Sequence, residues 1–285
     1  MRPLAPVLAA AALLLTAAAP PPPARPLAPS TKWRLDYAPT ECRLLRSFGA
    51  GRDEVTIQFS KLMPDPAIEV ALVGRRFPPT DHPVPARLAT STVPAIEAHA
   101  QGHEVGNGMM ASLRFRPNRA LADAFASDVA GGRPTRLGID FVRGYELALE
   151  LGRMEAPLVG LEKCVDDLVA TWGLDPAEQR ARSRAPEPVG SPAEWFRPSD
   201  FPAGLNAIGT GGVVVVRLGV GADGAVTDCA VAKAGGDKAF EELTCRLITE
   251  RARFTPALGA SGRPIASVWA NRIVWRPAKP FVRVS

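Results

Sequence analysis

A charged, proline-rich stretch interrupts the chain and limits how the polypeptide can fold. It reads RARSRAPEPVGSP at residues 180–192 and contains hardly any large apolar side chain. Such a composition is typical of a linker, because it offers little that a core could bury. We therefore predict two folded parts, at residues 31–179 and 195–280, with residues 180–194 as the linker between them.

The first residues, MRPLAPVLAAAALLLTAAAP, have the layout of a secretory signal peptide. A positive residue precedes a short apolar run, and small residues close it. We predict a signal peptide at residues 1–19, followed by a proline-rich linker at residues 20–30. An uncleaved membrane anchor is the alternative, although a membrane span needs about 20 apolar residues and this run is shorter.

Four cysteines in an exported chain predict two disulfides, since an even number of thiols in an oxidising compartment normally pairs. Three pairings are possible. If the two parts fold separately, Cys42 pairs with Cys164 and Cys229 pairs with Cys245. A zinc site or a redox pair at Cys229 and Cys245 would require C-x-x-C spacing, which the sequence lacks.

The first part is predicted to be an α+β domain. Residues 54–59, 67–74 and 135–142 are rich in alternating or β-branched residues and predict strands. Residues 121–132 have a helical apolar pattern that ends at two glycines. A second helix near residues 158–173 carries Cys164 on its apolar face. The middle, roughly residues 76–110, is loop-rich, and its pattern assigns it to neither helix nor strand.

The second part shows a strand, a strand, a helix and a strand in that order. Strands are predicted at 211–220 and 225–233, joined by the turn GADG, and a helix follows Asp237 as its N-cap. A last strand is expected at 265–275. This pattern predicts a small antiparallel sheet covered by one helix, in which a Cys229–Cys245 bond would join the second strand to the helix.

The ordered motifs of this second part resemble the TonB C-terminal domain family, over residues of about 195–280. They are a G-x-V-x-V strand, a DG-x-V turn, a GG-x-x-x-F approach to the helix, the segments RFTPA and GRPI, and a final amphipathic strand. The upstream segment FRPSDFPAGL (196–205) is similar to the aromatic and proline-rich lead-in of such domains.

The resemblance implies a periplasmic protein-interaction module of the Gram-negative envelope. Family members that act as energy transducers contact outer-membrane transporters by pairing an edge strand with a receptor segment, and main-chain hydrogen bonds supply the affinity. By resemblance, the last strand is the candidate edge. The alternative is that its residues only complete the core. The candidate residues are Val268, Trp269, Ala270, Asn271, Arg272, Ile273 and Val274.

The spacer of an energy transducer is long, whereas the proline-rich segment here is only residues 20–30, and a globular part follows it. We therefore expect this chain to bind an envelope protein, such as an outer-membrane receptor, without transducing energy. The inner membrane would be a partner only if the signal stays uncleaved. Nucleic acid is excluded as a partner, because an exported chain with no dense basic stripe lacks the necessary surface.

Catalytic and cofactor motifs are missing from the sequence, so we predict neither an enzyme nor a metal or cofactor site. His82, His99 and His103 fall in one segment, but HAQGHE is not a metalloprotease motif, and exposed loop histidines are the simpler interpretation. Two alternatives to an interaction module remain. Residues 31–184 could form an envelope enzyme or ligand-binding protein, with His82, His99 or Asp140 converging in a deep pocket, or the chain could be a structural envelope protein.

Overall fold

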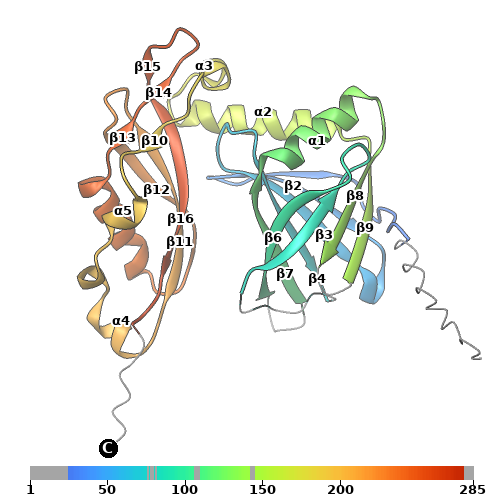
Figure 1. Ribbon diagram of the computed structural model, residues 1–285, viewed down its shortest axis with the longest axis horizontal. Coiled ribbons are helices and arrows are strands. Elements are labelled where there is room, and N and C mark those ends of the chain that lie inside the picture. Colours follow the sequence, from blue (N-terminus) through green and yellow to red (C-terminus); the bar gives the residue numbers. More distant parts are fainter. Residues whose placement is uncertain are drawn as a thin grey trace, which may run out of the picture.

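The computed structural model describes residues 25–278, apart from residues 76, 78, 79, 81, 106–109 and 142–144. The predicted signal peptide, and residues 279 and 280 of the predicted second part, lie outside the described residues. Buried apolar side chains gather in two clusters, one built from residues 42–169 and the other from residues 195–275. Figure 1 shows the corresponding two bodies side by side, so the chain is α+β with mostly antiparallel sheets, as predicted.

The first body is a nine-stranded antiparallel sheet in the order β1-β2-β3-β4-β7-β6-β5-β8-β9. Buried and exposed residues alternate along its strands, most clearly in β8. One face of each strand therefore points into a common core. The strands are β1 (Arg34–Tyr37), β2 (Cys42–Phe48), β3 (Val55–Lys61), β4 (Ile68–Gly74), β5 (Val84–Ala89), β6 (Ile96–Val105), β7 (Met110–Asn118), β8 (Thr135–Phe141) and β9 (Tyr145–Gly152).

The sheet closes into a barrel through the segment 27–31, which lies between β9 and β2. Leu27 donates its N–H to the Ala148 carbonyl (2.8 Å) and accepts from the Glu150 N–H (3.0 Å). On its other side, the Ser30 N–H donates to the Ser47 carbonyl (2.9 Å). Residues 27–30 of the predicted proline-rich linker are thus part of the barrel wall. Aromatic side chains such as Phe48, Phe59 and Phe115 fill the interior.

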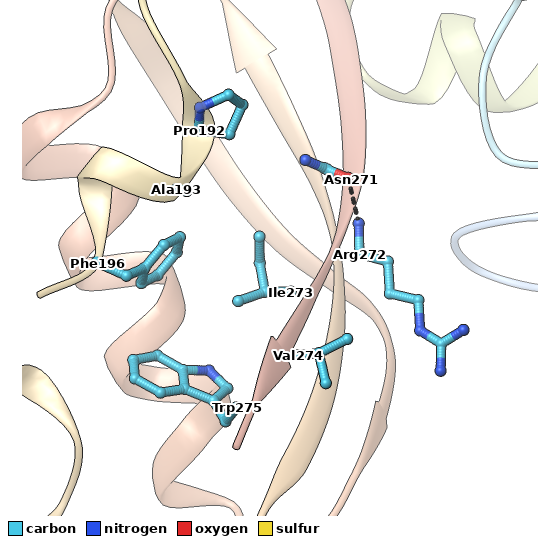
Figure 2. A pocket seen from close by; sticks show the side chains of 8 residues that line it. All are labelled: Pro192, Ala193, Phe196, Asn271, Arg272, Ile273, Val274 and Trp275. Carbon is cyan, nitrogen blue, oxygen red and sulfur yellow. Dashed lines mark hydrogen bonds between the residues drawn. The ribbon is translucent and has the colours of Figure 1, made fainter. Parts of the chain in front are cut away.

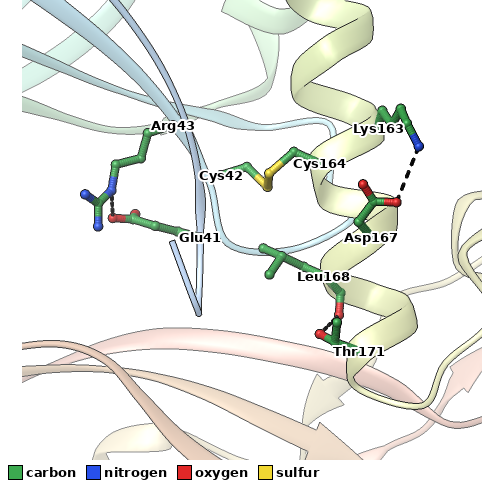
Figure 3. The surroundings of a disulfide bond; sticks show 8 residues. All are labelled: Glu41, Cys42, Arg43, Lys163, Cys164, Asp167, Leu168 and Thr171. Carbon is green, nitrogen blue, oxygen red and sulfur yellow. Dashed lines mark hydrogen bonds and ion pairs between the residues drawn. A yellow bond between two sulfur atoms is a disulfide. The ribbon is translucent and has the colours of Figure 1, made fainter. Parts of the chain in front are cut away.

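Two helices pack on the barrel (Figure 1). Helix α1 (Arg119–Ala130) begins where the Asn118 side chain accepts the Leu121 N–H (3.1 Å), and its Phe125 meets Phe59 edge to face. Helix α2 (Glu155–Thr171) lies against β1 and β2, and its Cys164 is bonded to Cys42 in β2 (Figure 3). The predicted helix pattern with Cys164 on its buried face agrees with the structure.

The segment 76–110, which the sequence indicates as loop-rich, instead contains two strands. Strands β5 and β6 occupy residues 84–89 and 96–105 and form the middle of the barrel, between β7 and β8. Few of their residues are β-branched, and β5 contains Pro85. Their strand state therefore comes from pairing with neighbours rather than from local propensity.

The second body is a three-stranded antiparallel sheet in the order β12-β11-β16, covered on one face by α5. Its main elements are β11 (Gly212–Val220), β12 (Val226–Gly235), α5 (Ala239–Arg251) and β16 (Ser267–Trp275). The Asp237 carboxylate accepts the Ala239 N–H (2.8 Å) at the start of α5. Gly224, in the β11–β12 turn, has a φ of 80°, a backbone conformation that favours glycine. Cys229 in β12 is bonded to Cys245 in α5.

The predicted linker runs along the second body. Helix α3 (Pro176–Ala181) spans the predicted boundary after residue 179. Its buried Gln179, the last residue of the predicted first part, donates to the Ala266 carbonyl (2.8 Å) and accepts from Ser267 Oγ (2.6 Å) of the second body. Strand β10 (Glu187–Pro188) then pairs with β13 (Phe254–Thr255). A short hairpin, β14 (Ala257–Leu258) and β15 (Pro264–Ile265), precedes β16. In the described part of the chain, none of the helices is both long and apolar enough to cross a membrane.

Candidate functional site

Strand β16 is an edge of the second sheet, because β11 pairs with it on one side only. The pairing is regular from Gly212–Trp275 to Val220–Ser267, with no register shift. Along β16, Trp269, Ile273 and Trp275 pack with the α5-side cluster. Arg272 and Val274 alternate with them and are exposed. One face of the strand is therefore held by the core, while its outer edge is unpaired.

Trp275 fixes the end of this strand. Its ring stacks on Phe240 of α5, with 5.4 Å between the centroids, and meets Phe196 edge to face at the same distance. Its indole N–H donates to Thr244 Oγ1 (2.9 Å), so the buried donor is satisfied. The edge is thus rigidly attached to the helix, which lowers the entropic cost of binding a partner strand there.

The outward direction of the β16 amides follows from one side-chain hydrogen bond. The Arg272 N–H donates to Asn271 Oδ1 (2.8 Å), and we infer from this bond that it points away from β11. In an antiparallel pair, the N–H and C=O groups of one residue point to the same side, and successive residues alternate. Because the register is unbroken, Ala270, Arg272 and Val274 direct their backbone groups away from β11.

A groove of about 320 Å³ runs beside this free edge (Figure 2). One wall is β16 from Asn271 to Trp275, and the other is the segment that carries Pro192, Ala193 and Phe196. This segment includes the short 3-10 helix η2 (Pro192–Trp195). An extended chain bound along the edge would place alternate side chains in this largely apolar groove.

The groove wall is held in place by Arg251, at the end of α5. Its guanidinium donates to both oxygens of Asp200 (2.5 and 3.0 Å) and to the Trp195 carbonyl (2.8 Å). Asp200 lies in the 3-10 helix η3 (Pro198–Asp200) and also accepts the Arg197 N–H (2.7 Å). The hydrogen bonds from Arg251 and then from Arg197 lower the pKa of Asp200 from 3.8 to about 2.

This lowered pKa predicts how the second body responds to acid. A carboxylate whose pKa is lower in the folded chain stabilises the fold above its ordinary pKa, and the contribution is lost as the pH falls through the folded value. We expect the melting temperature of the native chain to fall between pH 3.8 and about 2 partly through Asp200. Asp200→Asn should be less stable than the native chain at pH 7, with a smaller decline across that range.

Near-UV circular dichroism of the full chain, heated at pH 7, 4 and 2.5, measures this difference. Glu242→Gln, on the exposed side of α5, is the matched control that removes a carboxylate elsewhere in the same body. Equal pH profiles for Asp200→Asn and the native chain would contradict the role of Asp200.

The opposite edge, β12, is built differently. Its register against β11 shifts between Val215 and Val216, where Lys233 and Val231 are the partners and Ala232 is the extra residue. The Ala232 carbonyl accepts from Thr40 Oγ1 of the barrel (3.3 Å). Of the two edges, β12 is therefore bulged and contacted by the barrel, whereas β16 is regular and lies beside a groove.

A known family matches the part of the chain that contains β16, although the opposite groove wall at Pro192, Ala193 and Phe196 precedes the matched residues. Residues 197–277 match the family model of the Gram-negative bacterial TonB protein C-terminal. The resemblance identified in the sequence is confirmed over these residues, so the second body is a TonB C-terminal domain. Its family is one of non-enzymatic interaction domains, and the match implies a TonB-type protein-interaction module of the envelope. No curated protein matches the chain.

The structure distributes the predicted edge residues over three environments. Val268 is buried (3% exposed), and Trp269 packs on Trp195 and Phe254 in the core of the TonB C-terminal domain, so both side chains serve packing within the chain. The residues from Asn271 to Val274 line the groove, and Ala270 precedes them. Sequence reasoning missed the opposite wall at Pro192, Ala193 and Phe196, although the aromatic pair Trp195–Phe196 beside a proline was a usable signal.

The residues proposed for an enzymatic first part do not meet in one pocket. His99 is exposed on β6, His82 is exposed before β5, and Asp140 lies on β8. A hollow of about 650 Å³ on the barrel is lined by Asp140, but by neither His82 nor His99. On a strand, His99 and His103 are about 13 Å apart, too far to share a metal ion. Within the described ranges, His, Cys, Asp and Glu form no group that could hold a metal.

Proposed function

We propose that this chain is a periplasmic protein that binds an outer-membrane transporter or another envelope protein by accepting a strand at the edge of β16. The observation that carries the proposal is the groove along residues 271–275, beside backbone groups that point away from β11. A carbonyl of an added strand would replace Asn271 Oδ1 as the acceptor of the Arg272 N–H, and alternate side chains of that strand would enter the groove. The family match to a TonB C-terminal domain supports the same role.

In this proposal the chain does not transduce energy. Residues 27–31, at the end of the proline-rich segment, already belong to the barrel wall. Only residues 20–26 would then remain between a signal sequence and the barrel. At about 3.1 Å per residue for a polyproline-like chain, this is too short a spacer to reach an outer-membrane partner from the inner membrane. These features therefore favour an exported form of the chain that binds an envelope partner but transmits no force to it.

Site-specific photocrosslinking in living Gram-negative cells tests the proposal. A photoreactive amino acid replaces Val274, which is 45% exposed at the groove, and separately Val159, which is 64% exposed on α2 of the barrel. We expect the Val274 probe, and not the Val159 probe, to yield a defined adduct with an outer-membrane or other envelope protein, identified by mass spectrometry.

If the probes at Val274 and Val159 gave the same adduct, the partner would contact the chain without using the β16 edge specifically, and the proposal would be contradicted. An adduct at Val274 should also disappear in Arg272→Pro, because proline removes one of the outward amides. If it persisted there at full yield, the partner would be bound by side chains alone, and strand addition would be wrong.

A further inference from the structure

The turn between β1 and β2 of the barrel reaches the bulged edge of the TonB C-terminal domain. Thr40 in this turn donates its hydroxyl to the carbonyl of Ala232, the extra residue of the bulge. A carbonyl that the bulge has removed from the β11–β12 ladder is thereby satisfied. The first body thus donates a hydrogen bond to a carbonyl of the β12 edge that would otherwise be free to accept one from another strand.

An ion-pair cluster around the buried Glu41 reinforces the same contact. Glu41 is only 1% exposed, and its carboxylate lies 2.6 Å from Lys233 Nζ of β12 and 2.5 Å from Arg43 Nε. Lys233 also approaches Glu69 of β4 (3.4 Å). A buried carboxylate is tolerated only when it is paired, so the position of β12 against the barrel is strongly specified by Lys233. Figure 3 shows that Glu41 directly precedes Cys42, at the root of the turn.

The barrel therefore contacts one edge of this sheet, β12, and leaves the other edge, β16, open. Three strands in an open sheet present two edges, and a bare edge is a template for pairing with another chain. The edge of β16 is left beside a groove, whereas β12 is contacted at Ala232 and Lys233. Two identical antiparallel edges can pair with each other about a two-fold axis, so a second copy is the natural occupant of an uncovered β12.

We propose that the contact of Thr40 and Glu41 with Ala232 and Lys233 is a latch that withdraws β12 from intermolecular pairing, and that opening this latch lets two copies of the chain pair through β12. The latch is ionic, so one charge reversal should open it. Lys233→Glu would place a third carboxylate against Glu41 and Glu69. This inference concerns the edge opposite the groove and does not depend on the function proposed for β16.

Light scattering on the full chain, eluting from a size-exclusion column, tests the latch. We expect a monomer for the native chain and for Lys238→Glu, which makes the same charge change at an exposed position before α5. Lys233→Glu should show twice the mass. The exchange Glu41→Lys with Lys233→Glu should restore the monomer, which separates an opened latch from a misfolded chain.

Proline substitutions then identify the pairing edge. By the alternation that applies to β16, the Ala234 N–H points away from β11, so Ala234→Pro in the Lys233→Glu background should return the mass to that of one chain. Arg272→Pro in the same background should leave the dimer intact. A monomeric Lys233→Glu chain, a dimer that survives Ala234→Pro, or a dimer lost with Arg272→Pro would each overturn the proposal.

Discussion

Arg272→Pro is expected to weaken binding of the envelope partner by roughly 10- to 100-fold, while Arg272→Ala retains most of the affinity. Proline removes the outward N–H of residue 272 and leaves the partner's carbonyl unpaired, which costs about 1–3 kcal/mol. Alanine keeps that N–H and removes only an exposed side chain. Biolayer interferometry with the protein recovered by photocrosslinking measures both affinities.

The fold should survive this proline, because edge strands accept proline where the N–H faces away from the ladder. Asn271→Pro is the informative contrast. Residue 271 directs its N–H toward β11 by the same alternation, so the substitution should lower the melting temperature of the domain as well as the affinity. Equal losses of affinity in Arg272→Pro and Arg272→Ala would show that the guanidinium, and not the main chain, recognises the partner.

Loss of the Cys42–Cys164 disulfide is expected to cost the barrel on the order of 4–5 kcal/mol of unfolding free energy, whereas loss of Cys229–Cys245 costs the other domain about 3 kcal/mol. The sequence separations are 122 and 16 residues, and the constraint on the unfolded chain grows with loop length. Pairs of alanines are the appropriate replacements, since Cys42 and Cys164 are fully buried and serine would bury two hydroxyl groups.

Hydrogen exchange followed by mass spectrometry assigns each loss to its own domain, because peptides of the barrel and of the TonB C-terminal domain are read separately. Each double-alanine variant serves as the control for the other. A smaller loss of protection in the barrel of Cys42→Ala/Cys164→Ala than in the second domain of Cys229→Ala/Cys245→Ala would contradict the loop-length argument.

The TonB C-terminal domain could be predicted in outline because each of its elements carries a local signal. The GADG turn sets the first hairpin, Asp237 marks the start of the helix, and apolar residues recur at the periods that strands and helices require. The ordered motifs then led to the family that matches residues 197–277.

The barrel could not be predicted from the same kind of signal. Strand β6 reads IEAHAQGHEV, a sequence whose local preference for a strand is weak, and its state depends on pairing with β5 and β7. The closing segment was predicted as linker because of its prolines. Its Leu27 bonds to β9, a partner far along the chain, and no local pattern encodes such a contact.

Only one wall of the candidate site, the one formed by β16, could be predicted from the sequence. Its free edge followed from the family resemblance, and the structure places residues 271–274 at the groove. Two residues of the opposite wall, Pro192 and Ala193, lie in the segment that composition marked as linker, and the wall is positioned by Arg251 through Asp200 and Trp195. Contacts of this kind join residues about fifty positions apart, so they appear only once the domain has folded.

The seam at residues 27–31 also dictates when the barrel can close as an exported chain folds. Its hydrogen bonds join the beginning of the barrel sequence to β9, the last of the nine barrel strands in chain order. Until β9 has emerged, the earlier strands have two unpaired edges and no closed core. The bond from Cys42 must wait slightly longer, for Cys164. Closure is therefore a late, long-range event, and such steps are slow because loop entropy is lost before the contacts form. Chaperone protection of the exported chain should matter most before residue 164 has entered the envelope.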